Sequence, residues 1–155
     1  TSDGAFVIIK EDNDNRVIDL VNGGERRILD RDRALGHSDC GDSCMVGEAD
    51  KPDPGACVFW DLRLPLTVNH CRVLFETWNM GHVSVRGRRC LHSDDTSLRL
   101  VDLDTGAITP LVDHGMVSDG TYETQCHANL SPDGSVAAWV SNQAGRMDLW
   151  GLRVP

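Results

Sequence analysis

The stretch QCHANLSPDGSVAAWV, residues 125–140, decides the fold. It places a histidine, a Ser-Pro-Asp-Gly turn and an apolar run directly after one another. The Asp133-Gly134 pair predicts a hairpin turn, because glycine accepts the positive φ that such turns require. The apolar run that follows, rich in valine and tryptophan, predicts a β-strand.

Parts of this stretch recur along the chain at a constant interval. Histidines stand at 37, 82 and 127, in the pairs Gly36-His37, Gly81-His82 and Cys126-His127, so both intervals are 45 residues. Trp60 and Trp150 each lie 23 residues beyond the histidine of their copy. Repeats of about 45 residues, each with three or four short strands between Asp-Gly-type turns, predict a β-propeller.

We therefore expect an all-β protein with about four propeller blades. The partial blade 1–33 lacks its innermost strand, the blades 34–78 and 79–121 are complete, and the partial blade 122–155 stops after its third strand. Such open ends predict a fragment of a larger ring of seven or eight blades.

Composition excludes several classes of partner. The net charge of −9 argues against nucleic acid, which needs a basic face to neutralise its phosphates. No apolar run reaches the length of about 18 residues that a membrane span needs, and no signal peptide is visible, so we expect a cytoplasmic protein. For the same reason the six cysteines are predicted to be free thiols.

The repeated histidine has two interpretations. In WD-repeat propellers a Gly-His pair and a Trp-Asp pair form a structural network, and Gly36-His37 with Trp60-Asp61 look like those pairs. Alternatively, inner strands of successive blades begin around one channel, so their histidines can converge on one divalent ion. Gln125 and His127 are two residues apart, and on a strand they would point to the same side.

The sequence also resembles a known family. The Ser-Pro-Asp-Gly turn and the run LVDLDTGAITPL, residues 100–111, resemble TolB-like propeller repeats. More narrowly, GTYETQCHANLSPDGSVAAWVSNQAGRMDLWGLRVP, residues 120–155, resembles the last blade of the oligogalacturonate lyases. That resemblance implies a seven-bladed enzyme that holds a divalent metal, usually manganese, through three histidines and one glutamine. It also implies cleavage of acidic oligosaccharides by β-elimination.

The resemblance assigns roles residue by residue. His127 matches the second histidine of the family's closing His-x-His motif, whereas Gln125 stands where the first would be and Tyr122 where the glutamine would be. His82 matches the remaining ligand, and the segment around His37 is similar to the one that carries the family's proposed base. The prediction is a manganese site made by His82, Gln125 and His127, with His37 as the base.

The alternative is a non-catalytic propeller, which serves as a protein-interaction platform or as the gating domain of a peptidase. Under that hypothesis the partner is a protein and the repeated histidines are architectural. The other histidines, at 70, 92 and 114, lie off the repeat and are expected on the surface or in strands.

Overall fold

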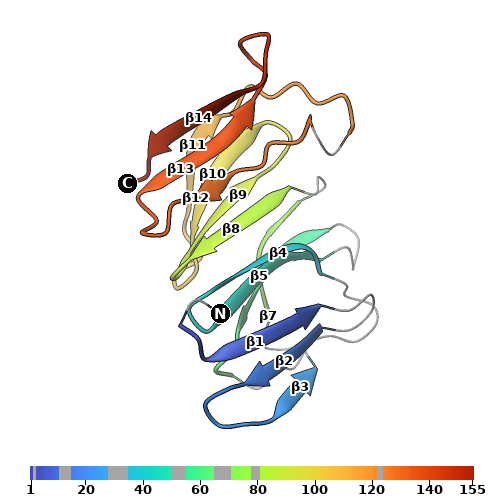
Figure 1. Cartoon of the computed structure of the whole chain (residues 1–155), viewed down its shortest axis with the longest axis vertical. Helices are drawn as coiled ribbons and strands as arrows, with labels where there is room; N and C mark the ends of the chain where they lie inside the picture. The colour runs from blue at the N-terminus through green and yellow to red at the C-terminus, as the bar shows by residue number, and fades with distance from the viewer. Residues whose placement is uncertain are drawn as a thin grey trace. The chain divides into compact units, whose positions relative to one another are not determined.

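The computed structural model describes residues 1, 3–10, 15–27, 35–49, 55–64, 71–77, 81–121 and 124–155. Within these ranges the strands are antiparallel and form four sheets (Figure 1), and Thr124 alone is in a 3₁₀ conformation. No helix among the described residues is long and apolar enough to cross a membrane. The chain divides into two compact units, Thr1–Met80 and Gly81–Pro155, and each is described by itself.

The first unit contains two sheets of consecutive strands. A three-stranded sheet, in the order β1-β2-β3, consists of β1 (Phe6–Lys10), β2 (Asn15–Asp19) and β3 (Glu25–Arg27). A four-stranded sheet, in the order β4-β5-β6-β7, consists of β4 (Leu35–Gly41), β5 (Cys44–Ala49), β6 (Ala56–Asp61) and β7 (Cys71–Glu76).

The core of the first unit lies between these two sheets. Phe6 and Val17 of the first sheet pack with Met45 and Trp60 of the second, and Trp60 is 1% exposed. Burying a side chain of that size contributes about 2–3 kcal/mol. Apolar burial of this kind, rather than the strand hydrogen bonds alone, holds two such sheets together.

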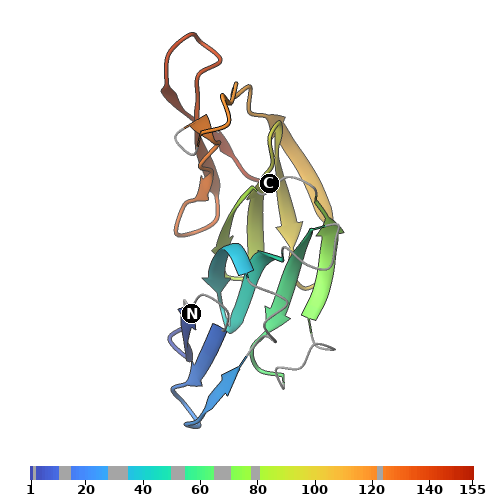
Figure 2. The same cartoon turned by 90° about the vertical axis from the view of Figure 1, so that its right-hand side faces the viewer.

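The second unit repeats this arrangement. A four-stranded sheet, in the order β11-β10-β9-β8, consists of β8 (His82–Arg86), β9 (Arg89–Ser93), β10 (Ser97–Asp102) and β11 (Ile108–Asp113). A three-stranded sheet, in the order β12-β13-β14, consists of β12 (Asn129–Leu130), β13 (Val136–Ser141) and β14 (Asp148–Arg153). Figure 2 shows the same strands from the side.

The two sheets of the second unit share one apolar core. Leu91 and Leu98 of the first sheet are fully buried and pack with Leu130, Ala137 and Trp139 of the second. Along β13 every second residue, from Ala137 on, is buried, as expected for a strand with one face on a core. This packing brings the start of β8 close to the segment that leads into β12.

The Ser-Pro-Asp-Gly turn joins β12 to β13 as predicted. The Asp133 carboxylate accepts hydrogen bonds from the Ser131 hydroxyl at 2.6 Å and from the Ser135 amide at 3.1 Å. These bonds lower the pKa of Asp133 to about 2. Gly134 has a φ of 71°, in the left-handed region that favours glycine.

The fold class predicted from the sequence is thus confirmed as all-β, with four sheets of the meander type found in propeller blades. The sheets lie at residues 6–27, 35–76, 82–113 and 129–153. The residues at which one blade ends and the next begins remain a prediction.

Candidate functional site

His82 opens β8, and a close backbone approach fixes this strand start. A Cβ atom at position 81 would overlap the carbonyl oxygen of Ser93, so only glycine fits there. His82 then pairs with Ser93 across the β8–β9 ladder. The Gly81-His82 pair therefore places the imidazole at one end of the sheet.

Gln125 and His127 do not lie on a strand, and this prediction from the sequence is wrong. β12 begins only at Asn129, and the amide of Ala128 donates to the carbonyl of Cys126 at 3.1 Å. That bond spans two residues and curls the backbone, whereas a strand would extend it. The expected alternation of side chains therefore does not apply to these two residues.

Tertiary packing nevertheless brings the three predicted ligands together. Nε2 of His82 lies 3.2 Å from Oε1 of Gln125, although 43 residues separate them in the sequence. The rings of His82 and His127 have their centroids 4.3 Å apart, at an interplanar angle of 54°. All three side chains are half-buried. We refer to His82, Gln125 and His127 as the histidine cluster.

The role of His82 in this contact depends on its tautomer. An amide oxygen can only accept a hydrogen bond, so the ring donates to Gln125 when Nε2 carries the proton. When the proton is on Nδ1 instead, the lone pair of Nε2 is available to a metal ion. The glutamine thus orients one imidazole, and the second imidazole packs against it.

The spacing of the cluster is compatible with one metal ion. With bonds of about 2.1 Å, two neighbouring ligand atoms of an ion lie about 3.0–3.4 Å apart, which includes the 3.2 Å between Nε2 and Oε1. Two imidazoles and an amide oxygen suit a divalent transition metal. Among the described residues, however, no group of three or more His, Cys, Asp or Glu side chains could hold a metal.

Cys126, between Gln125 and His127, is not a reactive thiol. Burial raises its pKa to about 12, and the negative charge of Asp94 acts in the same direction. The protonated thiol is neither a nucleophile nor a metal ligand at neutral pH. All six cysteines are free, and Cys126 packs in the core of the second unit.

His37 belongs to the first unit, so its placement is described on its own strand. It is half-buried in β4, where the pairing with β5 shifts register between Leu35 and Ser38. The histidine therefore sits at or beside a β-bulge, a feature common next to functional sites. Tyr122 and His70 lie outside the described residues.

No protein-family model matches the chain, and no curated protein matches it significantly in sequence. Solved structures do match. A TolB structure from Agrobacterium tumefaciens is 16% identical with a TM-score of 0.66, over 99% of this chain and 56% of that one. An oligogalacturonate lyase in complex with manganese is 14% identical with a TM-score of 0.61, over 91% and 41%. A chain of a nidogen–laminin complex is 10% identical with a TM-score of 0.60, over 96% and 57%.

The chain is built of β-propeller blades. At these identities the matches establish the fold alone, and the resemblance to TolB-like and oligogalacturonate lyase propellers noted in the sequence is confirmed at that level. The chain spans about half the length of the propellers it matches.

Reasoning from the sequence missed Ser93, the residue that links the two halves of the histidine cluster. Its hydroxyl lies 3.0 Å from the carbonyl oxygen of Cys126 and 3.3 Å from the amide of His82. No motif marks this serine, since it stands alone at the end of β9. A clue was available in Gly81, whose missing side chain indicates a close backbone approach.

The surface position considered for His114 is also wrong, because this side chain is 1% exposed. Its Nδ1 accepts from the amide of Met116 at 3.1 Å, and its Nε2 donates to the carbonyl of Asp94 at 2.8 Å. His92 is fully buried within β9. Both histidines support the blade and do not belong to the cluster.

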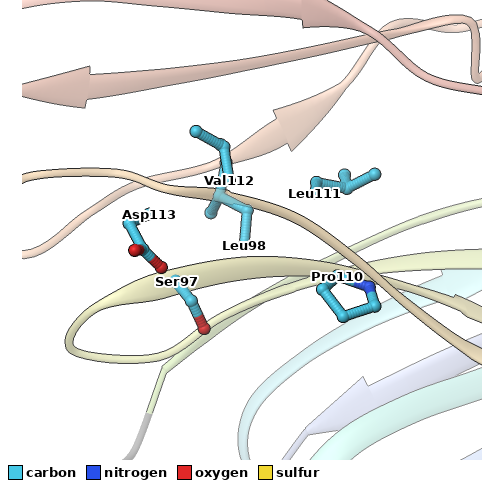
Figure 3. Close-up of a pocket in the computed structure, with 6 residues that line it drawn as sticks. All are labelled: Ser97, Leu98, Pro110, Leu111, Val112 and Asp113. Atoms are coloured by element: carbon cyan, nitrogen blue, oxygen red, sulfur yellow. The ribbon is translucent and has the colours of Figure 1, made fainter.

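A separate hollow of about 280 Å³ lies at the outer strands of the second unit. Figure 3 shows it with the polar side chains of Ser97 and Asp113 at one end and the ring of Pro110 toward the other. The hollow coincides with the bulge in the β10–β11 pairing between Leu98 and Arg99. Its lining contains no histidine or cysteine, so the histidine cluster is the better candidate for chemistry.

Proposed function

We propose that this propeller is a metal-dependent lyase that cleaves uronate oligosaccharides, such as oligogalacturonides, by β-elimination. The observation that carries this proposal is the meeting of His82, Gln125 and His127 within one blade pair. His82 and His127 stand where the resemblance to oligogalacturonate lyases puts metal ligands, and Gln125 stands where that family has a further histidine. One matched structure of that enzyme is a manganese complex.

The histidine cluster would hold a divalent cation, with manganese as the first candidate. Nitrogen from imidazole and oxygen from an amide accommodate manganese, iron, zinc or nickel, and the amide favours the harder of these. Such an ion would bind the uronate carboxylate and stabilise the charge that develops as the C5 proton leaves. Three protein ligands leave coordination positions open for that carboxylate.

His37 would act as the general base. A neutral imidazole near pH 7 takes the C5 proton, the released electron pair forms the C4–C5 double bond, and the C4–O glycosidic bond breaks. The departing oxygen takes a proton from solvent, which balances the step. The products are one saccharide with a new reducing end and one with an unsaturated uronate.

The overall charge makes a local cation necessary for such a substrate. The chain carries a net charge of −9, and oligogalacturonides are anionic, so the general field of the protein repels them. A divalent ion in the histidine cluster would reverse the sign of the potential locally. This requirement ties substrate binding, as well as chemistry, to the metal.

The test is a measurement of metal retention and product formation on the same protein. The purified chain should retain about one divalent metal per molecule and should produce the ultraviolet absorbance of unsaturated uronates from oligogalacturonides. His127→Ala and Gln125→Ala should reduce both. Gln143, the only other glutamine of the chain, is exposed, so Gln143→Ala is the matched control and should change neither.

A second candidate function, a protein-interaction platform or peptidase gating domain, is favoured by one surface. On the last sheet, Val136 and Leu149 are 37% and 77% exposed, and Leu149 pairs with Val140, which is half-buried against the core. Exposed apolar side chains that form a patch mark interaction sites in many proteins. Another matched structure comes from a nidogen–laminin complex.

Leu149→Arg separates the two functions. Under the lyase hypothesis this substitution leaves metal retention and product formation unchanged, because Leu149 lies on β14, outside the histidine cluster. If the unmutated chain has neither metal nor product, the interaction platform is the better account.

A further inference from the structure

Ser93 joins the two segments that supply the histidine cluster. A hydroxyl has one proton to donate, and the shorter of its two carbonyl contacts, 3.0 Å, goes to Cys126, whose neighbours are Gln125 and His127. The same oxygen accepts from the amide of His82 at 3.3 Å. One atom therefore connects the backbone beside each of the three cluster residues.

This connection is buried. Ser93 is 1% exposed and Cys126 5%, so water does not replace the hydroxyl if it is removed. A buried carbonyl that loses its donor pays the cost of desolvation, and its segment shifts toward another donor. Because residues 125–128 form no strand, no ladder of hydrogen bonds holds them in register against such a shift.

We propose that Ser93 is the positioning residue of the histidine cluster, and that its hydroxyl sets the distance between the His82 ring and the Gln125–His127 segment. This inference deepens the proposed function, since it takes the cluster as the metal site. Ligating side chains must hold their geometry within a fraction of an ångström, and residues that orient them affect metal affinity by about 10–100-fold.

Ser84 provides a matched control within the same two sheets. It is likewise 1% exposed, and its hydroxyl accepts from the amide of Leu130 at 3.1 Å, two residues further along β8. Ser84→Ala and Ser93→Ala therefore each remove one buried hydroxyl that links β8 or β9 to the following segment. Only Ser93 contacts the backbone beside the cluster.

The first measurement needs no metal. In the complete chain with labelled histidines, nuclear Overhauser contacts between the rings of His82 and His127 report the 4.3 Å separation directly. We expect this signal in the unmutated chain and in Ser84→Ala, and its loss in Ser93→Ala, at comparable free energies of unfolding. A signal that persists in Ser93→Ala, or that both variants lose equally, overturns the proposal.

The second measurement is a calorimetric titration with Mn²⁺. Ser93→Ala should bind at least about tenfold more weakly than the unmutated chain, whereas Ser84→Ala should stay within about twofold. If Ser93→Ala does not fold, Ser93→Cys replaces it, because a thiol keeps the size of the side chain but is a weak donor. Ser93→Cys should then lose Mn²⁺ affinity and the contact between the His82 and His127 rings. If it keeps both at the level of the unmutated chain, the proposal is overturned.

The two measurements distinguish the positioning role from the proposed function. If the unmutated chain shows the ring contact but does not bind Mn²⁺, the metal-dependent lyase is refuted. The positioning role of Ser93 is then tested by the ring contact alone, compared between Ser93→Ala and Ser84→Ala. A chain that binds Mn²⁺ equally in both serine variants keeps the metal site and refutes the positioning role.

Discussion

The two Gly-His pairs, Gly36-His37 in the first unit and Gly81-His82 in the second, share a sequence register but differ in local structure. Each histidine lies four residues before the end of its inner strand, at Gly41 and Arg86 respectively. Yet β4 passes through a register shift at its histidine, whereas β8 pairs regularly with β9 from His82 onward. The same motif therefore starts two differently built strands.

The residue types at corresponding positions of the repeat differ as well. In the sequence, Glu48 stands 45 residues before Ser93. Asp39 likewise corresponds to Ser84. The comparison teaches that the Gly-His pair sets only the position of the imidazole, while its chemistry depends on residues that the repeat does not preserve. We accordingly propose different roles for His37 and His82. The first of the four predictions that follow tests that difference, and the other three test contacts of the second unit.

The largest effect is expected for the base. His37→Gln should lower turnover of oligogalacturonides by about 100–10,000-fold, the usual contribution of a general base, and should leave Mn²⁺ affinity unchanged. His82→Gln should reduce both turnover and affinity. Steady-state kinetics and calorimetric titration measure turnover and affinity in both variants. Unchanged turnover in His37→Gln would show that His37 is not the base.

Next in size is the strand start of the second unit. Gly81→Ala should lower the free energy of unfolding by about 3 kcal/mol, the upper end of the usual cost of overpacking, because the added Cβ overlaps the Ser93 carbonyl and the backbone must move. Urea denaturation measures this change. Gly151→Ala is the control: its Cβ would lie 3.3 Å from the carbonyl of Ala137, so the change should stay below about 1 kcal/mol. Equal effects at both positions would show that the close approach at Gly81 is not the cause of the loss of stability.

A smaller effect is expected in the loop that leads to Gln125. The side chain of Asn142 accepts from the amide of Val117 at 2.8 Å and donates to its carbonyl at 2.9 Å. Asn142→Ala removes both bonds from an exposed site and should cost about 1 kcal/mol. Hydrogen exchange at Val117 should rise in this variant, and unchanged exchange would mean that the loop is held by other contacts.

The smallest effect concerns the turn at Asp133. The pKa of Asp133 in the folded chain is about 2, below its usual 3.8, and the hydrogen bond from the Ser131 hydroxyl is the largest cause. A depressed folded pKa contributes stability that is present above the unfolded pKa and is lost as the pH falls through the folded pKa. Asp133→Asn should therefore be less stable than the unmutated chain at pH 7, and the difference should shrink between pH 4 and pH 2. A difference independent of pH would exclude the ionised carboxylate as the cause.

Much of the architecture could be predicted from the sequence. The 45-residue interval and the Asp-Gly turns determine short antiparallel strands in repeated sheets, because alternation and turn chemistry act between neighbours in the chain. The Ser131–Ser135 turn is the clearest case, since its bonds join residues at most five apart. The same register selected His82 and His127 as candidates.

Only the tertiary structure decided which of these residues meet. The 4.3 Å contact between the His82 and His127 rings, and the Ser93 hydroxyl bond to Cys126, join residues 45 and 33 apart. The curl at Cys126 and Ala128, which the sequence suggested would be a strand, is likewise a product of that packing. The physical reason is that these contacts follow from the burial of Leu91, Leu130 and Trp139 in one core. A local alternation of apolar and polar residues shows which face of a strand is buried, but it does not show how the apolar faces of two sheets are aligned.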